Sequence, residues 1–264
     1  IVFPSGAMIK GKDILLYYSA ADTSCALSII PFDKLVKEIK KEIFIRMERY
    51  KDNPILAPKP NNAWESKAVF NPAAIYENGK FHIVYRAMSN DNTSVLGYAS
   101  SEDGFTIEER LPKPIYIPRE NFELKSRPEA NSGCEDPRLT ILGDTIYMCY
   151  TAYAGEGNPR VALTSISKKD FLKKNWKWKK PVLISPPGID DKDAAIFPKK
   201  IKGKYAILHR LGAEIWLDYV DDLNFDGETW IKGNVIISPR PGARDSKKIG
   251  IAAPPIETKK GWLL

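Results

Sequence analysis

The chain has 264 residues, of which 43% are hydrophobic and 28% are charged, so it carries enough apolar material for a substantial globular core. No apolar stretch reaches membrane-spanning length, and residues 1–6 have neither the basic region nor the apolar run of a secretory signal. We therefore expect a cytoplasmic protein with no membrane partner.

The net charge of +7 raises the question of a nucleic-acid partner, but the distribution of lysines does not favour one. Lysine-rich runs at residues 34–41, 168–180 and 199–204 are typical of solvated edges and turns, and no nucleic-acid-binding motif accompanies them. An anionic small molecule is the better expectation.

The cysteines and histidines exclude other classes of site. Cys25, Cys134 and Cys149 are widely spaced and odd in number, which predicts reduced thiols rather than a disulfide framework. His82 and His209 are the only histidines, so we expect no metal site.

An internal repeat determines the expected architecture. A glycine-containing turn precedes a short apolar run about every sixty residues, at residues 11–18, 79–86, 143–150, 203–210 and 261–264. A segment that pairs proline with small or apolar residues precedes each glycine, at residues 3–7, 71–74, 136–139, 194–198 and 252–255. The first four units add a third apolar run, at residues 25–29, 95–99, 161–165 and 215–219.

These runs are rich in β-branched and aromatic residues and are bounded by Gly, Pro and Asp, which predicts strands. Three to four short strands in each unit are typical of a propeller blade. The sequence therefore predicts an all-β fold, a five-bladed β-propeller whose single domain covers residues 1–264 and whose last blade is incomplete. One connecting helix is predicted at residues 31–46, where Leu35, Ile39 and Ile43 are spaced by four.

In a propeller the first strand of each blade lines the central channel, so polar residues in those strands are candidates for a ligand site. These candidates are Asn71, Glu135, Asp136, Arg138, Asp190, Asp191, Lys192 and Asp193. Residues that follow the second strands can face the same channel mouth, and these are Asp22, Arg86 and Arg210.

The segment of residues 131–138 is the most informative, because two adjacent carboxylates and a cation fall where a channel strand is expected. The simpler interpretation is a turn with a surface ion pair. An acid that protonates a departing sugar oxygen needs a raised pKa, which burial or a neighbouring carboxylate supplies. Asp136, next to Glu135, fits that requirement.

Arg86 and Arg210 close equivalent strands and are either solvated strand ends or a pair that converges on an anion or on sugar hydroxyls. His209 is more often a packed strand residue than a catalytic one. Lys247 and Lys248 are either an exposed pair or an extension of the same basic site.

Six segments in order, residues 70–74, 85–87, 133–138, 197–200, 209–210 and 248–250, resemble glycoside hydrolase family 130. That resemblance implies a five-bladed propeller that acts as a β-mannoside phosphorylase or, in some members, as a β-1,2-mannosidase. It covers residues 50–264 as the amino-terminal four-fifths of the family, whereas residues 1–36 resemble the family's carboxy-terminal end. The order of the chain therefore looks permuted.

The resemblance also implies roles for individual residues. Asp136 matches the general acid, which in some members acts through a hydroxyl of the mannosyl ring. The residues assigned to the sugar are Asn71, Arg86, Arg138, Asp193 and Asp22. The residues assigned to phosphate are Arg86, Arg210, Lys248 and His209.

The implied reaction is phosphorolysis of β-1,2- or β-1,4-mannosides with inversion to α-mannose 1-phosphate, and the reverse synthesis. Inorganic phosphate is the co-substrate, no metal or organic cofactor is expected, and homo-oligomerisation is left open. One alternative is an inverting β-1,2-mannosidase, which needs a second carboxylate to activate water. Others are a non-catalytic sugar-binding propeller and a five-bladed glycosidase that uses Asp22, Asp136 and Asp193 together.

Overall fold

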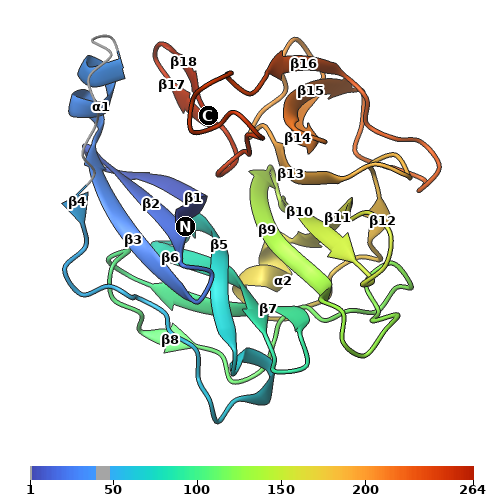
Figure 1. Cartoon of the computed structure of the whole chain (residues 1–264). Coiled ribbons are helices and arrows are strands. Elements are labelled where there is room, and N and C mark those ends of the chain that lie inside the picture. The colour runs from blue at the N-terminus through green and yellow to red at the C-terminus, as the bar shows by residue number, and fades with distance from the viewer. Residues whose placement is uncertain (1, 40–47) are drawn as a thin grey trace.

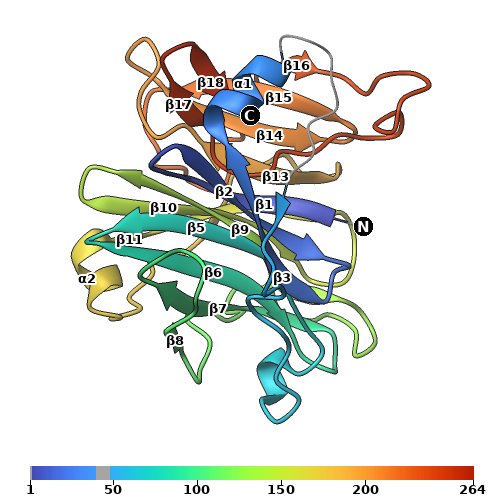
Figure 2. The same ribbon diagram turned by 90° about the vertical axis from the view of Figure 1, so that its left-hand side faces the viewer.

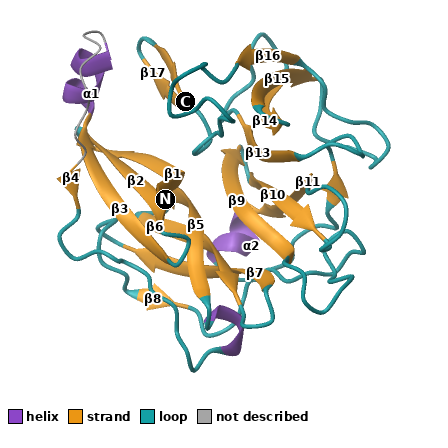
Figure 3. Cartoon of the chain, viewed as in Figure 1, coloured by secondary structure: helices purple, strands orange, loops and turns teal. Residues whose placement is uncertain are grey.

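The computed structural model describes residues 2–39 and 48–264, and strands account for most of its regular structure (Figure 3). The first sheet has the order β1 (Val2–Lys10), β2 (Asp13–Ala20), β3 (Ser24–Pro31) and β4 (Glu48–Arg49). The second unit contains β5 (Ala68–Glu77), β6 (Lys80–Met88), β7 (Thr93–Ser101) and β8 (Glu109–Arg110). Each unit is an antiparallel succession of neighbours along the chain.

The same arrangement repeats along the rest of the chain. The third unit contains β9 (Ser132–Leu142), β10 (Thr145–Tyr153), β11 (Arg160–Ser167) and β12 (Val182–Leu183). The fourth sheet contains β13 (Asp191–Ile196), β14 (Tyr205–Leu211), β15 (Glu214–Val220) and β16 (Asn234–Ile237). A hairpin of β17 (Ile256–Thr258) and β18 (Gly261–Leu263) ends the chain.

The units follow one another around the molecule, and β1, β5, β9 and β13 lie on its inner side (Figure 1). The second and third units are joined into one sheet by a short parallel contact of β7 with β9, at Thr93–Ser132 and Ser94–Gly133. Within the described residues the sheets do not close into a barrel. Because strands make up most of the regular structure, the predicted all-β class is confirmed, whereas the five-bladed propeller stays a prediction.

Apolar side chains fill the space between neighbouring sheets. Met148 and Tyr150 of β10 pack toward the second unit, whereas Cys149 packs toward the fourth sheet. Successive side chains of a strand point to opposite faces, so a sheet with sheets on both sides is buried on both faces. This packing explains why the apolar runs in the sequence are nearly continuous rather than alternating.

The repeat predicted the second and third strands of the first four units correctly, and β18 begins at the last of its glycines. The prediction for residues 252–255 was wrong, because this segment is not a strand and β17 begins only at Ile256. Pro254 and Pro255 have no backbone N–H to donate to a sheet.

The described part of the chain has two short α-helices besides a 3₁₀ turn, η1 (Ala63–Glu65). α1 (Phe32–Ile39) confirms the start of the predicted connector, and residues 40–46 of that prediction lie outside the described residues. α2 (Lys168–Leu172) occupies part of a lysine-rich run that had suggested edges and turns, and the Ser167 hydroxyl caps it by accepting from the Asp170 N–H. No helix in the described ranges is long and apolar enough to cross a membrane.

Candidate functional site

A cavity of about 500 Å³ opens where β5, β6, β9, β13 and β14 meet the turn between β2 and β3. Most of its polar lining is charged. The side chains that line it are Asp22, Thr23, Lys67, Ala68, Phe70, Asn71, Arg86, Met88, Asn131, Asp136, Lys192, Asp193 and Arg210. Seven of the candidates from the sequence are therefore brought together, although they come from units far apart in the chain.

Three of the lining residues occupy the same structural position in three inner strands. Asn71 of β5, Asp136 of β9 and Asp193 of β13 have positive φ angles of 47°, 52° and 56°. In each strand the register of pairing with the next strand shifts at this point, which is the mark of a β-bulge. Asn and Asp tolerate the left-handed conformation better than other non-glycine residues. The bulges thus turn three short polar side chains toward one cavity.

Asp136 is buried and hydrogen-bonded on one oxygen. Its Oδ1 accepts from Nδ2 of Asn71 at 2.7 Å and from Nη1 of Arg86 at 3.0 Å. Burial raises the pKa of Asp136, but Arg86, Asn71 and more distant cations together lower it by more, so the pKa lies below its ordinary value. The surface ion pair that the sequence also allowed is thereby excluded. The raised pKa that the sequence suggested for Asp136 was therefore wrong, because the pairing with Arg86 was not foreseen.

Arg86 is held on every side. Its Nε donates to Oγ of Ser94 at 3.0 Å, its Nη2 donates to Oε1 of Glu135 at 2.6 Å, and its guanidinium lies 4.5 Å from the ring centre of Phe70. Burial lowers the pKa of Arg86, but Glu135 and Asp136 raise it by more, so the side chain stays charged. With only 8% of its surface exposed, Arg86 is not a solvated strand end.

Asp193 is bound by two arginines. Its Oδ1 accepts from Nη2 of Arg138 at 3.0 Å, and its Oδ2 accepts from Nη1 of Arg210 at 2.5 Å. Arg138 lies behind the cavity and also donates to the carbonyl oxygens of Ile251 and Ala252. Arg138 therefore ties the segment before β17 to the centre of the molecule.

Two buried polar atoms beside the cavity have no hydrogen-bond partner in the described chain, Oδ1 of Asn71 and Nε of Arg210. Buried polar groups are normally paired, so an acceptor and a donor of this kind indicate where a ligand contacts the wall. Lys192 adds a cation whose Nζ lies 4.0 Å from Oε2 of Glu135. The cavity thus offers cations, among them Arg86, Lys192 and Arg210, together with the acceptor oxygens of Asn71 and of three carboxylates.

Two predicted phosphate ligands are not brought into this cavity. His209 is fully buried, with Nδ1 bonded to Oδ2 of Asp191 at 2.8 Å and Nε2 to the Lys232 carbonyl at 3.1 Å. Burial also raises the pKa of Asp191. Lys248 is exposed in the segment between β16 and β17 and does not line the cavity.

Other lining residues were not singled out in the sequence. They are Thr23, Lys67, Ala68, Phe70, Met88 and Asn131. Phe70 and Asn131 belong to segments that the sequence had marked. Lys67 directly precedes β5, and Met88 is the last residue of β6. The two are neighbours in the sheet, where the Lys67 N–H donates to the Met88 carbonyl at 3.0 Å. No sequence pattern distinguished them from other strand ends.

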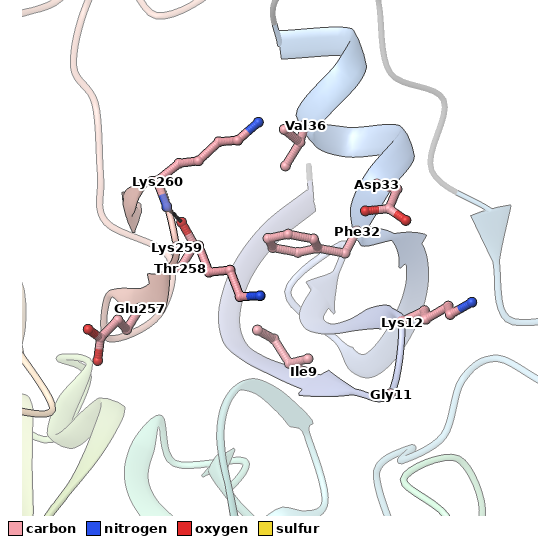
Figure 4. Close-up of a pocket in the computed structure, with 10 residues that line it drawn as sticks. All are labelled: Ile9, Gly11, Lys12, Phe32, Asp33, Val36, Glu257, Thr258, Lys259 and Lys260. Carbon is pink, nitrogen blue, oxygen red and sulfur yellow. Dashed lines mark hydrogen bonds between the residues drawn. The ribbon is translucent and has the colours of Figure 1, made fainter.

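A second cavity, of about 660 Å³, lies between β1, α1 and the β17–β18 hairpin (Figure 4). The 90° view in Figure 2 shows α1 and this hairpin at the same end of the molecule. Ile9, Phe32 and Val36 line the cavity, the Lys260 side chain extends from the hairpin toward α1, and the Lys12 side chain points away (Figure 4). It contains no buried charged network of the kind found around Asp136, so the smaller cavity is the better candidate for chemistry.

Thiol and metal chemistry are not supported at either cavity. Cys25, Cys134 and Cys149 are free and buried, and burial raises the pKa of each thiol, which disfavours the reactive thiolate. Among the described residues no group of three or more His, Cys, Asp or Glu side chains is arranged to hold a metal ion.

Comparison with known proteins places the chain among enzymes of mannoside metabolism. The sequence model of a family described as β-1,4-mannooligosaccharide phosphorylase, glycoside hydrolase family 130, matches residues 37–264. A 1,2-β-oligomannan phosphorylase from Thermoanaerobacter sp. is 38% identical over 227 residues, which are 83% of this chain and 71% of the relative. A β-1,2-mannobiose phosphorylase from the same organism is 40% identical over 232 residues, with the same coverage of 83% and 71%.

Solved structures agree with this relationship. A glycosyl hydrolase from Bacteroides ovatus superposes with a TM-score of 0.65 at 28% identity, over 84% of this chain and 70% of that one. A structure described with family 130 hydrolases that target β-1,2-mannosidic linkages in Candida mannan superposes with a TM-score of 0.67 at 27% identity, over 83% and 69%. The chain therefore belongs to glycoside hydrolase family 130.

Proposed function

We propose that this chain catalyses the phosphorolysis of β-mannosides, β-1,2- or β-1,4-linked, to α-mannose 1-phosphate, and the reverse synthesis. Relatives that share 38% and 40% of their aligned residues with it are phosphorylases of β-1,2-linked mannosides, and one at 28% is a β-1,4-mannooligosaccharide phosphorylase from Ruminococcus albus. The cavity around Asp136 has the charge that such a reaction needs. Arg86, Lys192 and Arg210 all line it, and a phosphate dianion requires cations of this kind.

One observation favours phosphate over water as the nucleophile. An inverting hydrolase needs a second carboxylate that is free to accept a proton from water. Asp193 lines the cavity but is bound by Arg138 and Arg210, so it is not free to act as that base, which leaves Asp22 as the carboxylate that a hydrolase would need. Phosphate is already a nucleophile and needs no such base.

In this mechanism Asp136 supplies the proton for the departing sugar oxygen, directly or through a mannosyl hydroxyl. A phosphate oxygen forms the new bond to the anomeric carbon on the opposite face while the glycosidic C–O bond breaks, and the proton of Asp136 completes the leaving hydroxyl. The protein's own charges hold the pKa of Asp136 low. A phosphate dianion close to Arg86 opposes that effect, so binding of the co-substrate favours the protonated acid.

The remaining assignments follow from contacts. Asn71 presents a buried acceptor to a sugar hydroxyl, and Arg210 presents a buried donor to a phosphate oxygen. Asp22 reaches the same cavity from the first sheet, and we assign it to the sugar. Arg138 lies behind the cavity, so its part is to hold Asp193. No metal or organic cofactor enters this scheme.

We further infer that residues 1–264 form one domain, a five-bladed propeller whose last blade is represented by β17 and β18. Four successive antiparallel units with apolar cores between neighbours support this interpretation. The first sheet, which resembles the carboxy-terminal end of the family, contributes Asp22 to the cavity, as a permuted blade would. Three buried free thiols fit a reducing cytoplasm.

The test is release of mannose 1-phosphate from β-1,2- and β-1,4-mannobiose, with and without inorganic phosphate, by the chain and its Asp136→Asn variant. Asn keeps the left-handed backbone conformation at residue 136 but cannot donate the proton of a carboxyl group. We expect phosphate-dependent release by the wild type and loss of about a thousandfold or more in the variant. Free mannose in the absence of phosphate would instead establish a hydrolase, with Asp22 as the carboxylate to examine.

A further inference from the structure

Glu135 is a buried carboxylate that precedes Asp136 in β9 and does not line the 500 Å³ cavity. Its Oε1 accepts a hydrogen bond from Nη2 of Arg86 at 2.6 Å, and its Oε2 lies 4.0 Å from Nζ of Lys192. Both cations line the cavity. Glu135 therefore contacts, from behind, two of the side chains that face the ligand.

The guanidinium of Arg86 is divided between two carboxylates. Nη1 donates to Asp136 at 3.0 Å, and Nη2 donates to Glu135 at 2.6 Å. An arginine that meets a single carboxylate often binds it with both nitrogens, and that bidentate pair is stronger than one hydrogen bond. Because Glu135 occupies Nη2, Arg86 makes only the single Nη1 contact with Asp136.

The charged groups that face Glu135 are Arg86 from β6, Lys192 from β13 and Asp136 from its own strand. Burial raises the pKa of Glu135, and Arg86 lowers it by less, so the pKa lies above its ordinary value. The neighbouring Asp136 has a lowered pKa. Two adjacent carboxyl groups thus share the cation Arg86 but have pKa values shifted in opposite directions, and the charge of each affects the protonation of the other.

We propose that Glu135 is a positioning residue that holds Arg86 and Lys192 against the cavity wall and limits how strongly Arg86 pairs with Asp136. This inference rests on the proposed phosphorolysis, in which the two cations bind phosphate and Asp136 supplies the proton. Without touching the substrate, Glu135 then affects two separable quantities. Its geometry determines phosphate affinity, and its charge keeps Asp136 easier to protonate.

Glu135→Gln tests the charge. The Gln side-chain oxygen still accepts from Arg86, but the negative neighbour of Asp136 is lost, so the pKa of Asp136 falls. Since Asp136 acts in its protonated form, the alkaline limb of kcat against pH moves to lower pH by on the order of one unit. KM for phosphate does not rise. An alkaline limb that coincides with that of the wild type would show that the charge of Glu135 does not affect Asp136, and would overturn that part of the proposal.

Glu135→Asp tests the geometry. The shorter side chain keeps its charge but retreats from Arg86, so we expect KM and Kd for inorganic phosphate to rise about tenfold while the alkaline limb stays in place. Calorimetric titration with inorganic phosphate measures Kd without turnover. A wild type that binds phosphate but releases no mannose 1-phosphate would contradict the proposed function alone. A Glu135→Asp variant that binds phosphate as tightly as the wild type would contradict the positioning role alone.

Glu65→Gln is the matched control. Glu65 is also a buried glutamate paired with an arginine, Arg110, at 2.5 Å, but neither residue lines the cavity. We expect this variant to lose thermal stability, because Arg110 loses its buried carboxylate, while the alkaline limb and KM for phosphate stay unchanged. A shift of the limb in Glu65→Gln as large as in Glu135→Gln would show that loss of a buried charge acts through the fold, and would overturn the proposal.

Discussion

The Nδ2 group of Asn71 donates to Oδ1 of Asp136 at 2.7 Å, which joins the bulge of β5 to the bulge of β9 across the cavity. Both residues are in the left-handed conformation. The contact leaves Oδ1 of Asn71 buried and without a partner in the described chain. A single amide therefore orients the proposed acid and presents an acceptor to the substrate.

Asn71→Gly removes this amide while the backbone keeps a conformation that glycine adopts freely. A lost hydrogen bond to a charged group corresponds to about 1.5–3 kcal/mol, so kcat/KM should fall roughly 10- to 100-fold and Tm should also fall. The control is Asn78→Gly, which replaces an exposed left-handed Asn in the turn before β6. Activity in the Asn71 variant equal to that of the control would show that the contact does not contribute to the reaction.

Asp193→Asn should destabilise the fold more than it alters the shape of the site. Asn tolerates the left-handed backbone, but Arg138 and Arg210 lose the carboxylate between them. Breaking a buried ion pair by removing one partner costs about 3–5 kcal/mol, which chemical denaturation measures. Glu102→Gln, at the exposed pair with Lys80, should cost less than about 1 kcal/mol. Equal losses in the two variants would mean that the Asp193 pairs do not stabilise the centre of the molecule.

The strands and the polar residues of their bulges were predictable because they are local features of the sequence. A glycine turn followed by an apolar run predicted β2, β6, β10 and β14, and short polar residues before Pro or Ala marked Asn71, Asp136 and Asp193. Lys67 and Met88 were not predictable in this way. Their place beside the cavity depends on how the sheets are oriented relative to one another, which no local pattern encodes.

The position of His209 away from the cavity could have been predicted from the alternation of side chains along a strand. His209 is adjacent to Arg210 in β14, and neighbours in a regular strand point to opposite faces. Arg210 lines the cavity, so His209 points away from it, toward Asp191. Glu135 and Asp136 are also adjacent, yet both contact Arg86, because the bulge at Asp136 breaks the alternation.

Gly133→Ala should disrupt the junction between the second and third units. Gly133 has a φ of +114°, and a Cβ there would lie 2.1 Å from the carbonyl oxygen of Ser94, whose hydroxyl holds Arg86. The backbone clash and the unfavourable φ together should lower the free energy of unfolding by about 3 kcal/mol or more. The specific activity of the protein that still folds should also fall, because Ser94 holds Arg86. Gly143→Ala, at a φ of +59° with no atom within 4 Å of the added Cβ, should cost only about 1–2 kcal/mol. Denaturation curves that coincide for the two variants would contradict the close contact at Gly133.

Arg210→Lys separates charge from hydrogen-bond geometry in the proposed phosphate site. Lysine keeps the positive charge near Asp193 but lacks the planar fork, and it has no counterpart of the buried Nε that is without a partner in the described chain. We expect KM for phosphate to rise about tenfold, because the loss of one charge-assisted hydrogen bond to phosphate costs about 1.4 kcal/mol. KM for the mannoside should change little, because Arg210 is assigned to phosphate and not to the sugar. Arg160→Lys, at a partly buried arginine that stacks on Trp230 and does not line the cavity, is the control for loss of an arginine elsewhere. If both substrates lost affinity equally in Arg210→Lys, the guanidinium would be acting on the whole cavity through Asp193 rather than on phosphate.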